Sequence, residues 1–190
     1  MRVGIAHHLG WAVAVTASAD HAVVDRRRIE LIEPDLPAAP IHHVGGPHVL
    51  HQTGPPIDDA ALAELVAQVH ASVGRATTTA LAELASAVPE PIASISVRAW
   101  PAEFPDDIAT LRRVPYESRA DSIMYCKVLA EVAQARGWDV AVYDAKHVEA
   151  DARDLLGARA KAVLEGPRAT LGPPWSKDHR MALAATIVAG

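Results

Sequence analysis

The stretch MRVGIAHHLGWAVAV, residues 1–15, decides the fold expected for this chain. Two β-rich segments, at residues 2–5 and 11–17, flank Gly10, and this arrangement is typical of a tight hairpin. A third strand is expected at residues 22–32, after a short polar turn. Three consecutive strands with short links predict an antiparallel meander at the start of the chain.

Beyond residue 57, helical patterns alternate with two further strands. Apolar residues at helical spacing predict one long helix or two short ones after Asp58, the expected N-cap. Helices are expected at about 58–88, 118–136, 146–164 and from Ser176 to the end, and strands at 92–99 and 138–145. This order predicts an α/β fold with a mixed five-stranded sheet, three strands antiparallel and then two parallel, and with helices on both faces.

Composition limits the class of protein. The chain has 190 residues, half of them hydrophobic, which fits a single domain over residues 1–190. The formal charge of −5 does not indicate a broad cationic face for binding nucleic acid. The single cysteine, Cys126, excludes a disulfide within the chain, favours a cytoplasmic setting and is expected to be a core thiol. No run of about 18 apolar residues is present, so no membrane span is expected.

Three segments carry a resemblance to a known family. They are VGIA with GWAVAV in the opening stretch, the helix and strand at 118–153, and KDHRMALAATIVA at 177–189. Together they resemble the ribonuclease H-like superfamily, and within it the Holliday-junction resolvase branch. The resemblance implies a ribonuclease H-like fold and cleavage of phosphodiesters by two divalent metal ions held by several carboxylates.

The family's acids are mostly replaced in this chain. Ala6 stands where the resemblance places the acid of the first strand, and Arg98 stands at the end of the fourth strand. In the last helix, the family acid falls near Met181, and Asp178 could serve in its place. We therefore expect the family's activity to be lost or rebuilt on other residues.

Two histidines, His7 and His8, occupy the tip of the first strand. Since side chains alternate along a strand, Ala6 and His8 share one face and His7 takes the other. His8 could act as a metal ligand or as a catalytic acid or base, because imidazole titrates near neutral pH and binds borderline metals. The alternative is that the pair closes the hairpin and hydrogen-bonds the backbone.

The last helix begins with WSKDHR, and Ser176 is its expected N-cap. Lys177, Asp178 and His179 then fall in the first turn, where a cation, an acid and a base could bind a phosphate-bearing group. These three join His8 as catalytic candidates, with Asp178 as the anionic ligand and Lys177 as the charge neutraliser. The alternative is that Asp178 only offsets the helix dipole and Lys177 is solvated.

Residues 33–57 form a segment rich in His, Pro and Gly that is expected to be a surface loop without a regular element. His42, His43, His48 and His51 lie within ten residues and could chelate Zn²⁺ or Ni²⁺. If the loop folds over the strand tips, His42 and His43 would join His8 and Asp178 around one divalent metal, either zinc, or manganese or magnesium. A solvated loop with incidental histidines is the alternative.

Two further sets of residues are candidates for ligand binding. Glu117, Asp121 and Tyr125 share a helix face near the carboxyl ends of the strands, where α/β sheets bind ligands, although a helix-capping box is the alternative. Arg26 and Arg28 share one face of the third strand and could contact a phosphate or an acidic partner. Protection of an edge strand against aggregation would also explain these arginines.

The leading functional hypothesis is a divergent metal-dependent phosphodiesterase or hydrolase with a histidine-rich site. Its ligand would be nucleic acid or another phosphate-containing molecule. The rival hypothesis is a catalytically inactive scaffold that binds nucleic acid or a protein partner, and a third is self-association as a homodimer through the alanine-rich last helix. No glycine-rich phosphate loop is present, so neither a nucleotide nor a flavin cofactor is expected.

Overall fold

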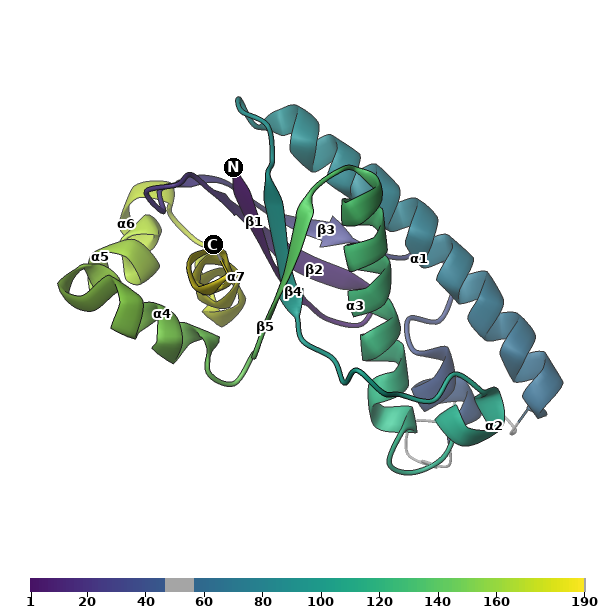
Figure 1. Ribbon diagram of the computed structural model, residues 1–190. Coiled ribbons are helices and arrows are strands. Elements are labelled where there is room, and N and C mark those ends of the chain that lie inside the picture. The colour runs from purple at the N-terminus through teal and green to yellow at the C-terminus, as the bar shows by residue number, and fades with distance from the viewer. Residues whose placement is uncertain (47–56, 190) are drawn as a thin grey trace.

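The computed structural model describes residues 1–46 and 57–189, and its centre is a five-stranded sheet (Figure 1). The strand order is β3-β2-β1-β4-β5. β1 pairs antiparallel with β2 and parallel with β4, β2 pairs antiparallel with β3, and β4 pairs parallel with β5. The strands are β1 (Arg2–His7), β2 (Trp11–Ala17), β3 (Val23–Glu30), β4 (Ser94–Arg98) and β5 (Asp139–Tyr143). The predicted α/β fold with a mixed five-stranded sheet, three strands antiparallel and then two parallel, is therefore confirmed.

The opening hairpin forms as predicted. Gly10 has a φ of +87°, a conformation that glycine adopts at little cost. The N–H of His8 donates to the carbonyl of Trp11 at 2.8 Å and closes the turn. His7 is thereby paired with Ala12, and His8 stands just beyond the end of β1.

Helices cover both faces of the sheet (Figure 1). One face packs against α1 (Asp59–Ala87) and α3 (Glu117–Ala135), and α1 is the single long helix among the two alternatives. The other face packs against α7 (Lys177–Val188), which α4 (Val148–Leu156) and α5 (Ala160–Glu165) border in turn. The short elements are η1 (Pro40–Gly45), α2 (Ile108–Leu111), η2 (Gly157–Arg159) and α6 (Pro167–Leu171).

Side chains alternate between the two faces of β1, and this alternation divides the core into two layers. Val3 and Ile5 are buried on the side of α1 and α3, whereas Ala6 is buried on the side of α7. Between them, Gly4 allows α7 to approach very closely, because a Cβ there would lie 1.8 Å from the carbonyl oxygen of Ala182. This contact seats α7 across β1 and brings the first turn of the helix to the end of the strand.

Three sequence expectations about helices are wrong. The helix expected at 146–164 is interrupted at Gly157, whose φ of +53° belongs to the left-handed region and ends α4. No helix was expected between residue 164 and Ser176, but α6 forms there. The segment 33–57, expected to lack a regular element, contains the π-helix η1, while residues 47–56 lie outside the described residues.

None of the helices within residues 1–46 and 57–189 is long and apolar enough to span a membrane.

Candidate functional site

The carboxyl ends of β1, β4 and β5 meet at one edge of the sheet because these three strands are parallel. The first turn of α7 lies beside them, since His8, just past β1, contacts Asp178. Arg98, the last residue of β4, is paired with Tyr143 of β5. We call this group the strand-end site, and its members are Ala6, His8, Arg98, Tyr143 and Asp178.

His8 and Asp178 form the most direct contact in the strand-end site. Nε2 of His8 lies 3.1 Å from Oδ2 of Asp178, and the side chains are 42% and 27% exposed, so both can be reached from solvent. His8 and Ala6 lie on the α7 side and His7 lies on the other, as the alternation along β1 predicts.

Trp11 extends the strand-end site toward the edge strand β3. The His8 ring stacks on the Trp11 ring with centroids 4.1 Å apart and an interplanar angle of 13°. Cζ of Arg28 lies 4.1 Å from the centre of the same ring. Two groups this close cannot share one face of the ring, so Trp11 is held between His8 and Arg28.

Arg98 is the functional candidate that the sequence reasoning did not include in its site. Its side chain is partly buried, and Nε is buried without a hydrogen-bond partner among the described residues. Arg98 lies opposite Tyr143 in the pairing of β4 with β5; burial raises the pKa of Tyr143, and the nearby charge of Arg98 opposes that rise. The Tyr143 hydroxyl donates to the carbonyl of Ile5 at 2.6 Å. The available signal was a cation at a position where the resemblance expects an acid.

His7 belongs to the core and not to the strand-end site. Its Nε2 lies 3.0 Å from Oγ of Ser122 and 3.5 Å from Sγ of Cys126. Burial lowers the pKa of His7 to about 3 and raises the pKa of Cys126 to about 12, so both side chains are neutral at pH 7. Cys126 is the buried core thiol that was expected.

His42 and His43 lie away from His8. They belong to η1, which packs against α1 and α3, and their rings are 5.2 Å apart. The predicted set of His8, His42, His43 and Asp178 is therefore not assembled, and residues 1–46 and 57–189 contain no group of three or more His, Cys, Asp or Glu placed to hold a metal. His48 and His51 fall outside the described residues.

Asp121 explains why η1 lies against α3. Its Oδ2 accepts the N–H of His42 at 2.9 Å, and its Oδ1 accepts the N–H of Ile41 at 3.2 Å. Burial raises the pKa of Asp121 to about 6, although these two hydrogen bonds oppose the rise. Tyr125 on the same helix face donates to the carbonyl of Ala38 at 3.0 Å. This face therefore positions the segment at residues 38–42.

The helix-capping box that was the alternative explanation of these residues is not formed at the start of α3. The helix begins at Glu117 after Tyr116, with no side-chain cap, and the Ser118 hydroxyl donates to the carbonyl of Pro115. Asp121 cannot serve as the partner of such a box because η1 uses its carboxylate. Glu117 is buried beside it, 2% exposed, and does not present its carboxyl group to solvent.

Arg26 and Arg28 share a strand face, but their surroundings differ. Arg26 donates to the carbonyls of Leu171 at 2.8 Å, Gly172 at 2.9 Å and Pro173 at 3.4 Å, and also to that of Pro174. These contacts tie β3 to the segment before α7. Arg26 therefore has a structural role as a clamp between these two segments. Its expected role in ligand binding is corrected accordingly.

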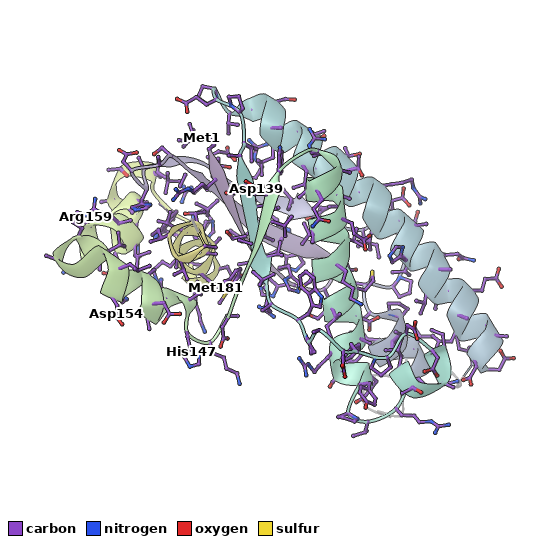
Figure 2. All side chains as sticks on the ribbon, in the orientation of Figure 1. Met1, Asp139, His147, Asp154, Arg159 and Met181 are labelled. Carbon is purple, nitrogen blue, oxygen red and sulfur yellow. The ribbon has the colours of Figure 1, made fainter. Side chains whose placement is uncertain are left out.

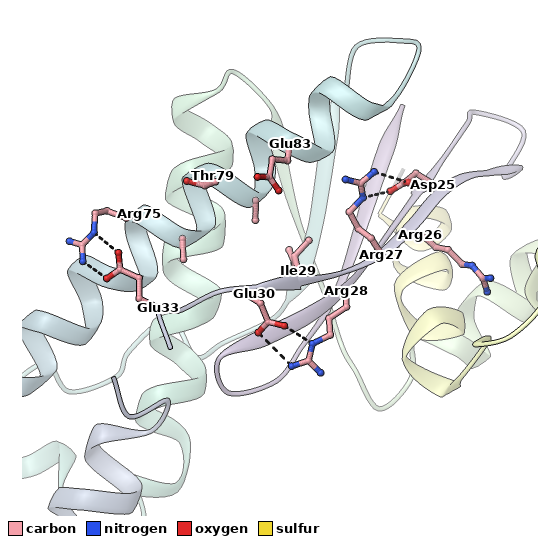
Figure 3. Close-up of a pocket in the computed structure, with 12 residues that line it drawn as sticks. Asp25, Arg26, Arg27, Arg28, Ile29, Glu30, Glu33, Arg75, Thr79 and Glu83 are labelled. Atoms are coloured by element: carbon pink, nitrogen blue, oxygen red, sulfur yellow. Dashed lines mark hydrogen bonds and ion pairs between the residues drawn. The ribbon is translucent and has the colours of Figure 1, made fainter. Parts of the chain in front are cut away.

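Arg28 borders a groove of about 820 Å³ between β3 and α1, but its side chain points away from α1 (Figure 3). It pairs with Glu30 at 2.7 Å, and a similar pair joins Arg27 to Asp25. Both pairs connect residues two positions apart on one strand. They place charge along an exposed sheet edge, which fits the protective role that the sequence left open.

The remaining candidates lie in the first turn of α7. His179 is buried, and its Nδ1 lies 2.8 Å from Oγ of Ser176 and accepts the Ser176 N–H at 3.2 Å, forming a capping box. Burial lowers the pKa of His179. Lys177 is exposed at the first helical position. The predicted N-cap at Ser176 is confirmed, and His179 has a structural role in holding it.

No family model matches this sequence, and no curated protein matches it. Among solved structures, RuvC of Thermus thermophilus in complex with a Holliday junction substrate is similar, with a TM-score of 0.49 and 15% identity over 98% of this chain and 90% of that chain. A second Thermus thermophilus RuvC structure has a TM-score of 0.46 and 15% identity over 98% and 91% of the two chains.

Proposed function

We propose that this protein binds a phosphate-bearing ligand, with nucleic acid as the leading candidate, at the strand-end site. The observation that carries the proposal is Arg98, whose buried Nε has no hydrogen-bond partner among the described residues. A buried donor without a partner is costly, and a guanidinium group binds phosphate oxygens through a planar fork of N–H donors. Because Nε itself is shielded from solvent, a phosphate group would bind the remaining N–H donors of the partly exposed Arg98 side chain.

The residues around Arg98 support an anion better than a pair of metal ions. Mg²⁺ and similar hard ions need several oxygen ligands, whereas the positions that would hold acids carry Ala6, Arg98 and Met181. Met181 lies on α7, between the sheet and the α4–α6 side of the molecule (Figure 2). The donor set therefore does not fit a two-metal site, and a guanidinium group in its place would repel divalent cations.

A metal-dependent hydrolase is the second candidate, and one observation favours it. Nε2 of His8 and Oδ2 of Asp178 are a nitrogen and an oxygen donor 3.1 Å apart, on side chains that remain partly exposed. Zn²⁺ accepts both types of ligand and leaves a position open in catalytic sites. A single ion bound by this pair would need further ligands from solvent or substrate.

Fluorescence anisotropy with a labelled single-stranded oligonucleotide, a duplex and a four-way junction tests the proposal. Binding should persist in EDTA and weaken steeply between 50 and 200 mM salt, because phosphate contacts release counterions. Arg98→Gln should weaken binding about tenfold or more and reduce the salt slope by about 1. Arg119→Gln, which removes an exposed arginine from α3, is the matched control and should leave affinity within about twofold.

Two outcomes would overturn the binding proposal. One is no binding of any of the three probes at 50 mM salt, and the other is equal affinity of the Arg98→Gln variant and the control. Calorimetric titration of Zn²⁺ and Mn²⁺ into metal-stripped protein distinguishes the metal-dependent hydrolase from the binding protein. Micromolar binding that His8→Ala abolishes, together with cleavage of a probe only when that metal is added, would replace the binding proposal with the hydrolase.

A further inference from the structure

A second group of charged side chains lies on the far side of α7 from the sheet. Elements α4 to α7 line a cleft of about 230 Å³ there, within the helical lobe in Figure 1. We call it the arginine cleft, and its lining residues are Glu149, Arg153, Glu165, Arg168, Trp175 and Arg180. Arg180 and Asp178 are two positions apart on α7 and do not face the same way. The arginine cleft is thus separate from the strand-end site.

Ion pairs fix two of the three guanidinium groups in the arginine cleft. Nη2 of Arg153 lies 3.0 Å from Oε1 of Glu165 and 3.4 Å from Oε1 of Glu149. Nε of Arg180 lies 3.2 Å from the same Glu149 oxygen. Each of these arginines makes its ion pairs through one nitrogen, while a guanidinium group carries five N–H donors. Donors therefore remain on both arginines for a ligand in the cleft.

Arg168 gives the arginine cleft an excess of positive charge. It is exposed on α6, and none of the ion pairs that hold the cleft involves it. The cleft thus sets three guanidinium groups against two carboxylates, Glu149 and Glu165, which leaves one net positive charge. An anion with several acceptor oxygens would complement both the charge and the remaining donors.

The wall of the arginine cleft is already ordered. Trp175 is buried, and its Nε1 donates to the carbonyl of Leu164 at 2.8 Å, which joins the end of α5 to the start of α7. Arg26 holds the neighbouring carbonyls at residues 171–174. A ligand entering the cleft would therefore not have to order the backbone, and this keeps the entropic cost of binding low.

We propose that the arginine cleft binds a phosphate dianion, either inorganic phosphate or the 5′-phosphate monoester of a mononucleotide. Arg168 supplies the unpaired cation, and Arg153 and Arg180 supply N–H donors that their carboxylate partners hold in place. The cleft of about 230 Å³ suits a small ligand better than a polymer. This site would act independently of the strand-end site.

Isothermal titration calorimetry with inorganic phosphate and with adenosine 5′-monophosphate tests the proposal, and adenosine is the uncharged control. Arg168→Gln should weaken phosphate binding about tenfold or more, because a charge-assisted hydrogen bond is lost. Arg159→Gln removes an exposed arginine of the same lobe, outside the cleft, and should change the dissociation constant less than twofold. Equal heats for phosphate and the monophosphate would identify the phosphate group as the ligand, and tighter binding of the monophosphate would identify a nucleotide.

The proposal is overturned if neither phosphate nor the monophosphate binds, or if Arg168→Gln and Arg159→Gln weaken binding equally. The Arg98→Gln variant distinguishes the two sites. If Arg98→Gln abolishes phosphate binding while Arg168→Gln does not, the phosphate lies in the strand-end site and the arginine cleft has no ligand of this class. Arg168→Gln and Arg159→Gln both replace exposed side chains, so circular dichroism and thermal melting should match the unmodified protein.

Discussion

His8 Nε2 lies 3.1 Å from Asp178 Oδ2 and joins the tip of β1 to the first turn of α7, although the residues are 170 positions apart. The contact depends on the close packing of α7 against β1 at Gly4, which aligns the start of the helix with the end of the strand. On its other side, His8 is supported by the ring of Trp11. The pair is therefore held from both directions while remaining open to solvent.

Replacing Asp178 with Ala is expected to change stability by less than about 1 kcal/mol, because a partly exposed ion pair contributes little. Ser176→Ala should cost more, about 1–2 kcal/mol, because it removes the cap of α7 that His179 completes. Urea unfolding of both variants measures the difference. A loss above about 2 kcal/mol for Asp178→Ala would show that this carboxylate is needed to start the helix.

Gly4→Ala is expected to destabilise the fold by about 3 kcal/mol or more. The added Cβ would lie 1.8 Å from the carbonyl oxygen of Ala182, so the backbone of α7 would have to move away from β1. Gly74→Ala is the control, since a Cβ there meets nothing within 4 Å and lies inside α1, where alanine should stabilise by about 0.5–1 kcal/mol. Thermal denaturation should move in opposite directions for the two variants, and a shared direction would contradict the close approach of α7.

Arg26→Met is expected to loosen the segment before α7. The variant loses the donors that bind the carbonyls at residues 171–174, and a loss of about 2–3 kcal/mol is expected because these are charged hydrogen bonds. Hydrogen exchange should accelerate in peptides covering residues 166–176. Arg28→Met is the comparison, because its pair with Glu30 is more than half exposed, and its effect should stay below about 1 kcal/mol. Equal effects of the two variants on stability would contradict the role of Arg26 as a clamp.

Local signals in the sequence predicted the elements that depend on neighbouring residues. Gly10 marked the hairpin, and Asp58 marked the start of α1, where its side chain accepts the N–H of Ala61 at 2.8 Å. Gly137, with a φ of +78°, marked the end of α3. Each of these features is decided by the conformation of a few consecutive residues, which is why the sequence alone was enough.

Contacts between distant residues were beyond such signals. Asp121 binds backbone N–H groups about 80 positions away, and Arg26 binds carbonyls about 146 positions away. Both looked like candidates for ligand binding because their partners are main-chain atoms, which leave no mark in the side-chain pattern. Arg98 did carry a signal, a cation in an acid's place, but its unpartnered Nε could be seen only in three dimensions.

His7 should make the protein less stable in acid. Its folded pKa is about 3 against 6.5 for the free side chain, so between these values the unfolded chain holds a proton that the native state lacks. Above pH 6.5, His7 does not lower the free energy of unfolding. Below pH 6.5, its effect lowers that free energy by about 1.4 kcal/mol per pH unit, which amounts to about 2 kcal/mol at pH 5. Between pH 7 and 5, the change in the free energy of unfolding measured in urea should be about 2 kcal/mol less favourable for the unmodified protein than for His7→Gln. His70→Gln, which replaces an exposed histidine of α1, should behave as the unmodified protein does.

Asp121 should have the opposite effect on stability over part of the same pH range. Its folded pKa is about 6 against 3.8 for the free carboxyl group, so the native state keeps its proton to higher pH than the unfolded chain. The favourable contribution is present below pH 3.8 and is lost as the pH rises to 6, by about 3 kcal/mol in total. Between pH 4 and 6 it therefore offsets the rise in stability that His7 produces.

Asp121→Asn separates these opposing effects. The amide keeps one acceptor oxygen for η1 and does not titrate, so the variant should show the full His7 slope, with stability rising by about 1.4 kcal/mol per unit from pH 4 to 6. The His7→Gln variant should show the reverse, with stability falling over that range. Urea unfolding at pH 4, 5 and 6 measures both slopes. If Asp121→Asn leaves the slope of the unmodified protein unchanged, Asp121 is ionised throughout this range, and the hydrogen bonds from Ile41 and His42 outweigh its burial.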